Sequence, residues 1–88
     1  MENDFCITVM DSGNYTMNLN RILKQKGYDF DTMATPSRIS QGNCGLSIQF
    51  PYEYAQKIID IGREYSLPVK KIFRIHSMGN QVGYERIY

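Results

Sequence analysis

The sequence predicts an α+β fold in which two helices cover one face of a four-stranded antiparallel sheet. Three observations support this prediction. Short apolar or alternating segments indicate strands, two segments with apolar residues at helical spacing indicate helices, and their order is β-α-β-β-α-β. Two split β-α-β units of this kind form a ferredoxin-like two-layer sandwich with strand order 4-1-3-2. Residues 1–76 would make up this single domain, and residues 77–88 a C-terminal tail.

The first half of the domain is predicted to contain two strands and one helix. Residues 5–10 form the first predicted strand. Successive side chains in a strand point to opposite faces, so the odd-numbered and the even-numbered residues lie on different faces of the sheet. The polar turn that follows can cap a helix over residues 15–26, and Gly27 is placed to end that helix in a left-handed conformation. Residues 28–35 form a second strand, whose two aspartates indicate a position at the sheet edge.

The second half begins with a loop over residues 35–43, which is rich in Pro, Ser, Gly and Asn. Apolar and polar side chains alternate along residues 46–50, which gives the clearest strand signal in the chain. Pro51 suits the first turn of a helix that runs to about Tyr65, because proline lacks only an N–H that is unpaired there anyway. Residues 70–76 then form the fourth strand.

The composition limits the functions that the chain can have. Its 88 residues leave no room for a second, cofactor-binding domain, and no cofactor is expected. The formal charge of +1 gives no long-range attraction for a polyanion, so nucleic acid is not expected as a partner. The absence of a membrane-spanning run and of a signal peptide predicts a cytoplasmic protein with no membrane partner. Two cysteines are too few for a usual zinc site, so no metal is expected.

The predicted topology brings the candidate site residues to one end of the sheet. The first and second strands run in the same direction, so the loop after the second strand lies where the first helix begins. Cys44 in this loop is the candidate reactive thiol, since helix N-terminal N–H groups and nearby cations lower the pKa of a cysteine. The cations expected at this end are Lys70 and Lys71, at the start of the fourth strand. The candidate binding residues at this end, several of which also suit turns and caps, are Arg38, Ser40, Gly45, Ser12 and Asn14.

Cys6 and His76 are predicted at the opposite end of the sheet. A strand of this length spans about 17–20 Å, whereas a disulfide needs Cα atoms within about 7 Å of each other. We therefore expect no disulfide between Cys6 and Cys44 within one chain, and no Cys-His hydrolase pair. Cys6 lies in a strand interior and is expected to be structural.

A series of short motifs carries a resemblance to a known family. These motifs are an Asp-Ser turn, a helix closing on glycine, a Thr-Pro pair, an Ile-Ser pair and a cysteine before a strand; here they are Asp11 and Ser12, Gly27, Thr35 and Pro36, Ile39 and Ser40, and Cys44. From Thr8 to about Ile75 the chain resembles the small bacterial family of selenium/sulfur carrier protein-like proteins. It departs from the family pattern in that Ser37 separates the proline from Arg38, and the spacing from Ser40 to Cys44 is one residue longer.

The resemblance implies a cytoplasmic carrier. In such a protein Cys44 would accept sulfur or selenium as a persulfide or selenosulfide, and would pass it to a partner. Donor and acceptor proteins would therefore be its partners. The protein would act as a stoichiometric shuttle more than as an enzyme.

An alternative function is a non-catalytic regulatory module that binds a small ligand or another protein, because folds of this kind often do so. The sequence places Thr8, Ser47 and Gln49 on the sheet face away from the helices, which suggests that this face is wet or only partly covered. Such a face would seat the C-terminal tail or form the surface of a homodimer. This alternative needs no reactive thiol.

Overall fold

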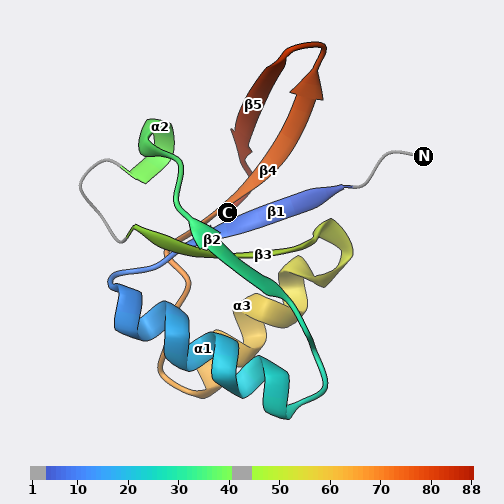
Figure 1. Cartoon of the computed structure of the whole chain (residues 1–88). Coiled ribbons are helices and arrows are strands. Elements are labelled where there is room, and N and C mark those ends of the chain that lie inside the picture. The colour runs from blue at the N-terminus through green and yellow to red at the C-terminus, as the bar shows by residue number, and fades with distance from the viewer. Residues whose placement is uncertain (1–3, 41–44) are drawn as a thin grey trace.

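The computed structural model describes residues 4–40 and 45–88, and its sheet is built from five antiparallel strands in the order β2-β3-β1-β4-β5 (Figure 1). Two longer helices, one helical turn and a short 3-10 helix complete the described part. In chain order the elements are β1 (Phe5–Val9), α1 (Gly13–Gln25), β2 (Asp31–Ala34), α2 (Ser37–Ser40), β3 (Leu46–Pro51), η1 (Tyr52–Tyr54), α3 (Ala55–Glu64), β4 (Lys71–Met78) and β5 (Gln81–Arg86).

The predicted ferredoxin-like sandwich with a four-stranded sheet of order 4-1-3-2 is wrong, although the α+β class holds. A fifth strand, β5, pairs with β4 from Phe73↔Arg86 to Met78↔Gln81 and extends the sheet. Gly79 and Asn80 connect the two strands, and a glycine suits the first position because its φ is +62°. The third helix, α2, lies within the segment that the sequence predicted as a loop.

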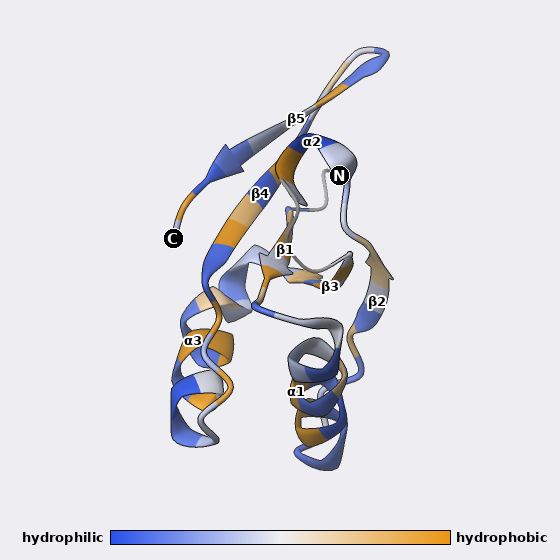
Figure 2. Cartoon of the chain, turned by 90° about the vertical axis from the view of Figure 1, so that its left-hand side faces the viewer, coloured by the Kyte–Doolittle hydropathy of each residue, from blue (hydrophilic) through white to orange (hydrophobic). Residues whose placement is uncertain are grey.

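Helices α1 and α3 lie on the same face of the sheet (Figures 1 and 2). Their apolar sides and the facing strand residues form the main core, which consists of Cys6, Met10, Leu19, Leu23, Ile48, Phe50, Ile58, Ile59, Ile61, Val69 and Ile72. Leu19 and Leu23 are four residues apart in α1, so both point to this face. The predicted amphipathic pattern of both helices is thereby explained by burial.

The beginning and end of α1 follow standard capping chemistry. The Ser12 hydroxyl accepts a hydrogen bond from the Tyr15 amide at 3.2 Å, and the helix starts two residues before the predicted position. At the other end the Tyr28 amide donates to the Leu23 carbonyl at 2.9 Å, with Gly27 at a φ of +97°. The helix therefore turns sharply into the segment before β2.

The opposite face of the sheet carries a smaller apolar cluster. Ile7 and Val9 of β1 pack with Ile39 of α2, and the partly buried residues around them are Met33, Phe73, Ile75 and Tyr84. Ile39 is 6% exposed, so one helical turn is enough to cover this part of the face. The prediction that the face away from the helices is wet or only partly covered is thus only partly right. Thr8 points with Cys6 and Met10 toward the helices, and both Thr8 and Ser47 are fully buried.

Candidate functional site

The candidate site lies at the end of the sheet where β1 ends and α1 begins. The Thr16 hydroxyl, in the first turn of α1, donates to the Leu46 carbonyl at 3.2 Å and approaches the Ser12 carbonyl at 3.3 Å. These contacts tie the N-terminal turn of α1 to the first residue of β3. The strand start is next to Gly45, which directly follows Cys44 in the chain.

Cys44 itself lies outside the described residues, as do its three preceding neighbours. On its C-terminal side Gly45 is exposed, and the Gly45 carbonyl accepts a hydrogen bond from the Thr35 amide at 2.8 Å. On the other side Ser40 ends α2, and its hydroxyl donates to the Ser37 carbonyl at 3.4 Å. The residues that bracket the predicted thiol are therefore fixed by hydrogen bonds within the chain.

A group of buried hydroxyl side chains underlies this end of the sheet. The buried polar residues of the described chain are Thr8, Thr16, Thr35 and Ser47, and all four are hydrogen-bonded. The Thr35 and Ser47 hydroxyl groups are 2.6 Å apart. The Thr8 hydroxyl accepts the Ile48 amide at 2.9 Å, just past the β1–β3 pair Ile7↔Gln49. A side chain thus replaces a backbone acceptor here. Sequence reasoning missed this group, because isolated Ser and Thr residues in strands give no signal of burial.

Arg38 is held by the hairpin of β4 and β5. Its Nη1 donates to the Val82 carbonyl at 3.0 Å, and its guanidinium carbon lies 5.9 Å from the centre of the Tyr84 ring. These contacts join α2 to β5, a strand that the sequence did not predict. The described contacts of Arg38 are thus with β5, while Ser12 caps α1 and Asn14 is exposed in the first turn of that helix.

Lys70 lies at the predicted end of the sheet with Asp11. The Lys70 ammonium is 3.3 Å from an Asp11 carboxylate oxygen, and both side chains are more than half exposed. The Lys70 amide donates to the Val9 carbonyl at 2.9 Å. The Lys70 ammonium is therefore already paired with a carboxylate in the absence of a ligand.

Cys6 has the environment of a structural thiol. It has no solvent exposure, and it belongs to the core between the sheet and the helices. Burial raises the pKa of the Cys6 thiol to about 11, with a smaller opposing effect from Arg74. A thiol out of contact with solvent cannot meet a partner in the folded chain, as expected for a cysteine in a strand interior.

The comparison with protein families matches residues 5–74 of the chain to the model described as "Putative Se/S carrier protein-like". The chain belongs to this Se/S carrier-like family. The matched segment includes Cys44 and the elements from β1 to the first half of β4. Comparisons with curated proteins and with solved structures gave no match.

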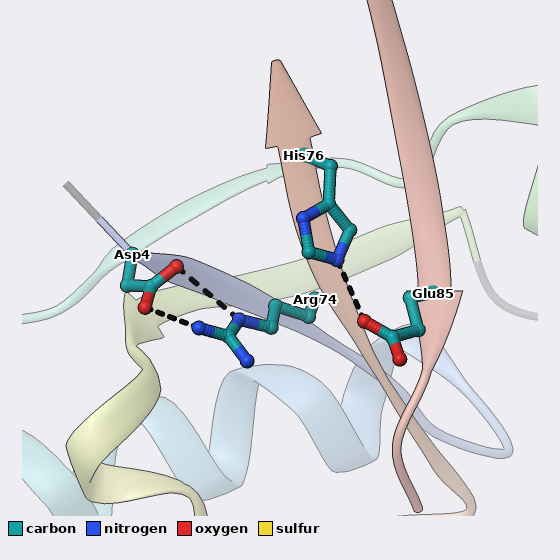
Figure 3. A network of polar contacts seen from close by, with 4 residues as sticks. All are labelled: Asp4, Arg74, His76 and Glu85. Atoms are coloured by element: carbon teal, nitrogen blue, oxygen red, sulfur yellow. Dashed lines mark hydrogen bonds and ion pairs between the residues drawn. The ribbon is translucent and has the colours of Figure 1, made fainter. Parts of the chain in front are cut away.

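A polar network lies around the end of the family match (Figure 3). Arg74 donates from Nε to Asp4 at 3.2 Å and forms an ion pair with it through Nη2; the guanidinium also lies over the Tyr52 ring at 4.2 Å. The hydrogen bond from Arg74 lowers the pKa of Asp4. His76 Nε2 is 2.6 Å from Glu85 Oε1, across the hairpin and beyond the matched segment. Along β4, these contacts lie beyond Lys71, which pairs with Val9 at the end of β1.

The described residues contain no group of three or more His, Cys, Asp or Glu side chains arranged to hold a metal ion. In the same part of the chain no helix is both long and apolar enough to cross a membrane.

Proposed function

We propose that Cys44 is the thiol on which this family member carries sulfur or selenium. The observation that carries the proposal is the burial of Cys6. The chain belongs to a Se/S carrier-like family and has two cysteines, one of which is fully buried with its pKa raised to about 11. The carrier chemistry therefore falls to the other cysteine. Cys44 also lies two residues before Leu46, the first residue of β3, which is tied to the N-terminal turn of α1.

The transfer step needs no external oxidant. The Cys44 thiolate attacks the outer sulfur of a donor persulfide, the new Sγ–S bond forms, and the sulfur–sulfur bond in the donor breaks. The donor leaves as a thiolate, and the proton stays on the outer sulfur, so atoms, charge and electrons balance. A selenosulfide forms by the same exchange when the outer atom is selenium. Hand-off to an acceptor thiol is the reverse step with a different partner.

Several residues at this end of the sheet would stabilise the anion. The first turn of α1 presents backbone N–H groups, which favour negative charge, and Ser12 and Asn14 lie at that turn. Gly45 and Ser40 bracket the thiol in the chain. We assign these residues to binding of the persulfide. Arg38 would join them only after it leaves the Val82 carbonyl, because Val82 pairs with Ser77 toward the far end of β4. The partners would be donor and acceptor proteins in the cytoplasm, where thiols stay reduced.

Intact-mass measurement after treatment with glutathione persulfide tests the assignment. The wild-type chain and Cys6→Ala are expected to gain one sulfur atom on a reactive thiol, and Cys44→Ser to gain none. Circular dichroism checks that each variant is folded. Loading of Cys44→Ser to the wild-type level would exclude Cys44 as the carrier.

The pH dependence of Cys44 alkylation in the Cys6→Ala variant separates a carrier from a non-catalytic module. A carrier thiol is expected to titrate well below the usual value of about 8.5. A thiol with that usual pKa and the alkylation rate of a model thiol would instead favour a regulatory or interaction module.

A further inference from the structure

A groove runs between α1 and the edge strand β2. It has a volume of about 700 Å³, and its floor includes Met17 of α1, Thr32 of β2 and Leu46 of β3. Met17 is 62% exposed, so the groove presents apolar surface to solvent. β2 is an edge strand of the sheet, and Figures 1 and 2 show it near α1.

The charged residues that line the groove are all cations. Arg21 and Lys24 lie on α1, and no carboxylate is among the described lining residues. Arg21 donates to the Asn18 side-chain oxygen at 3.1 Å, a neutral partner that leaves its charge uncompensated. An occupant with carboxylate groups therefore matches the rim, and one with an apolar group matches the floor.

The strand edge beside the groove offers backbone groups to an extended chain. The Thr35 amide donates to the Gly45 carbonyl, so Thr35 and Gly45 are a hydrogen-bonded pair in the register of β2 with β3. Backbone groups alternate in direction along a strand, so those of Ala34 and Thr32 point away from β3. The side chain of Thr32 points to the groove, whereas those of Asp31 and Met33 point to the other face.

Asn20 also lines the groove, and its Oδ1 is buried without a hydrogen-bond partner. A buried acceptor without a partner costs free energy, and rotation of the amide toward an N–H group of an occupant would remove that cost. This third feature favours an occupant that supplies hydrogen-bond donors as well as apolar surface.

We propose that this groove binds an extended acidic segment of a partner protein, which adds to the sheet at β2 and inserts an apolar side chain between β2 and α1. This is strand addition at a sheet edge, in which backbone hydrogen bonds give affinity and side-chain pockets give specificity. Leu46 of the floor is two residues from Cys44 in the chain. The further assignment of the partner as the donor or acceptor of sulfur or selenium rests on the proposed function; binding of the peptide does not.

Fluorescence anisotropy with two labelled peptides tests the proposal. One peptide alternates leucine and glutamate, and the other alternates leucine and lysine. The glutamate peptide is expected to bind, and the lysine peptide to bind at least about tenfold more weakly. Equal binding of the two peptides, or binding of neither, would overturn the proposal.

Charge reversal at the rim gives a matched pair of variants. Lys24→Glu is expected to weaken binding of the glutamate peptide about tenfold. Lys57→Glu makes the same charge change on the exposed side of α3 and is expected to leave binding unchanged. An equal loss in both variants would show a nonspecific charge effect and would exclude the groove.

NMR amide shifts on the unsubstituted chain locate the bound peptide without risk of misfolding. The largest changes are expected at Thr32 and Ala34, and changes confined to β5 would overturn the proposal. Thr32→Pro removes one outward N–H, a donor that the added strand needs, and is therefore expected to abolish binding. The variant is expected to fold, because proline is tolerated at this kind of edge position.

Two further measurements distinguish peptide binding in the groove from self-association and from the carrier chemistry. Self-association in sedimentation that removes peptide binding would assign the groove to a second copy of this chain and overturn the proposal. Cys44→Ser is expected to bind the glutamate peptide as the wild type does. Persulfide loading without peptide binding would refute the groove alone, and peptide binding without loading would refute the carrier alone.

Discussion

The two faces of the sheet are covered to different depths. On one face α1 and α3, of 13 and 10 residues, bury a cluster that includes the fully enclosed Phe50, Ile58 and Cys6. On the other face a single helical turn places Ile39 over Ile7 and Val9, and the surrounding residues are only partly buried. One sheet in a small chain thus has a well-packed face covered by two helices and an opposite face covered by a single helical turn. The segment that precedes the predicted thiol belongs to the thin side.

The largest loss of stability is expected on the helix-covered face. Phe50→Ala removes a fully buried ring that packs beside Phe30, with ring centres 6.2 Å apart. We expect the free energy of unfolding to fall by about 3–5 kcal/mol, because the cavity between two helices and a sheet cannot close. Urea denaturation measures this change. A much smaller loss would mean that the main core adapts more easily than its packing suggests.

A smaller loss is expected for the matched change on the other face. Ile39→Ala removes the side chain by which α2 covers Ile7 and Val9. We expect the free energy of unfolding to fall by about 2–3 kcal/mol, which is at the low end for a buried isoleucine, because a one-turn helix can shift to fill the space. The same urea titration gives the value. If it equals the loss in Phe50→Ala, the two faces do not differ in rigidity.

A loss of intermediate size is expected when one of the buried hydroxyl groups at the end of the sheet is removed. Thr8→Val keeps the side-chain shape but removes the acceptor for the Ile48 amide, which is 2.9 Å away. A buried N–H without a partner is expected to cost about 1–2 kcal/mol. Thr8→Ser keeps the hydroxyl and serves as the control, and amide hydrogen exchange at Ile48 reports the lost bond directly. Unchanged protection of that amide in Thr8→Val would contradict the assigned role.

The smallest effect is a pH dependence caused by Cys6. Its folded-state pKa is raised by burial from 9.0 to about 11, so the unfolded chain loses this proton first as pH rises. The stabilising effect is complete below the unfolded pKa and is lost as pH rises through the folded one. At pH 10 the loss is about 1 kcal/mol. Comparison with Cys6→Ala isolates this effect from lysines and tyrosines; parallel pH profiles of the two proteins would contradict it.

The sequence predicts the helix-covered face better than the other one. The helical spacing of apolar residues in α1 and α3 and the alternation in β3 are local signals. They predicted these elements correctly, because the apolar face that each pattern defines is the one that becomes buried. α2 depends on distant partners, because it is held through Ile39 and Arg38. A segment of four residues whose stability comes from such contacts carries little local signal. β5 instead pairs with its neighbour β4 across a two-residue Gly79-Asn80 turn, a local hairpin signal that the prediction of a C-terminal tail overlooked.

The same difference explains which parts of the candidate site were predictable. The cap role of Ser12 and the location of Lys70 follow from local signals and strand direction, and the structure has both. The contacts of Arg38 require β5, so its partners Val82 and Tyr84 were out of reach of sequence reasoning. The face of Thr8 was predicted wrongly because β1 is apolar on both sides, which leaves the helix-covered side undetermined.

The family match ends at Arg74, yet α2 is anchored to residues beyond that point. The hairpin of β4 and β5 supplies the Val82 carbonyl and the Tyr84 ring to Arg38, and Tyr84 also packs near Ile39. A chain truncated after Arg74 would therefore lose the anchor of a helix some forty positions earlier in the sequence. Substitutions in this hairpin, outside the matched segment, would therefore change how α2, the helix that precedes Cys44 in the chain, is held.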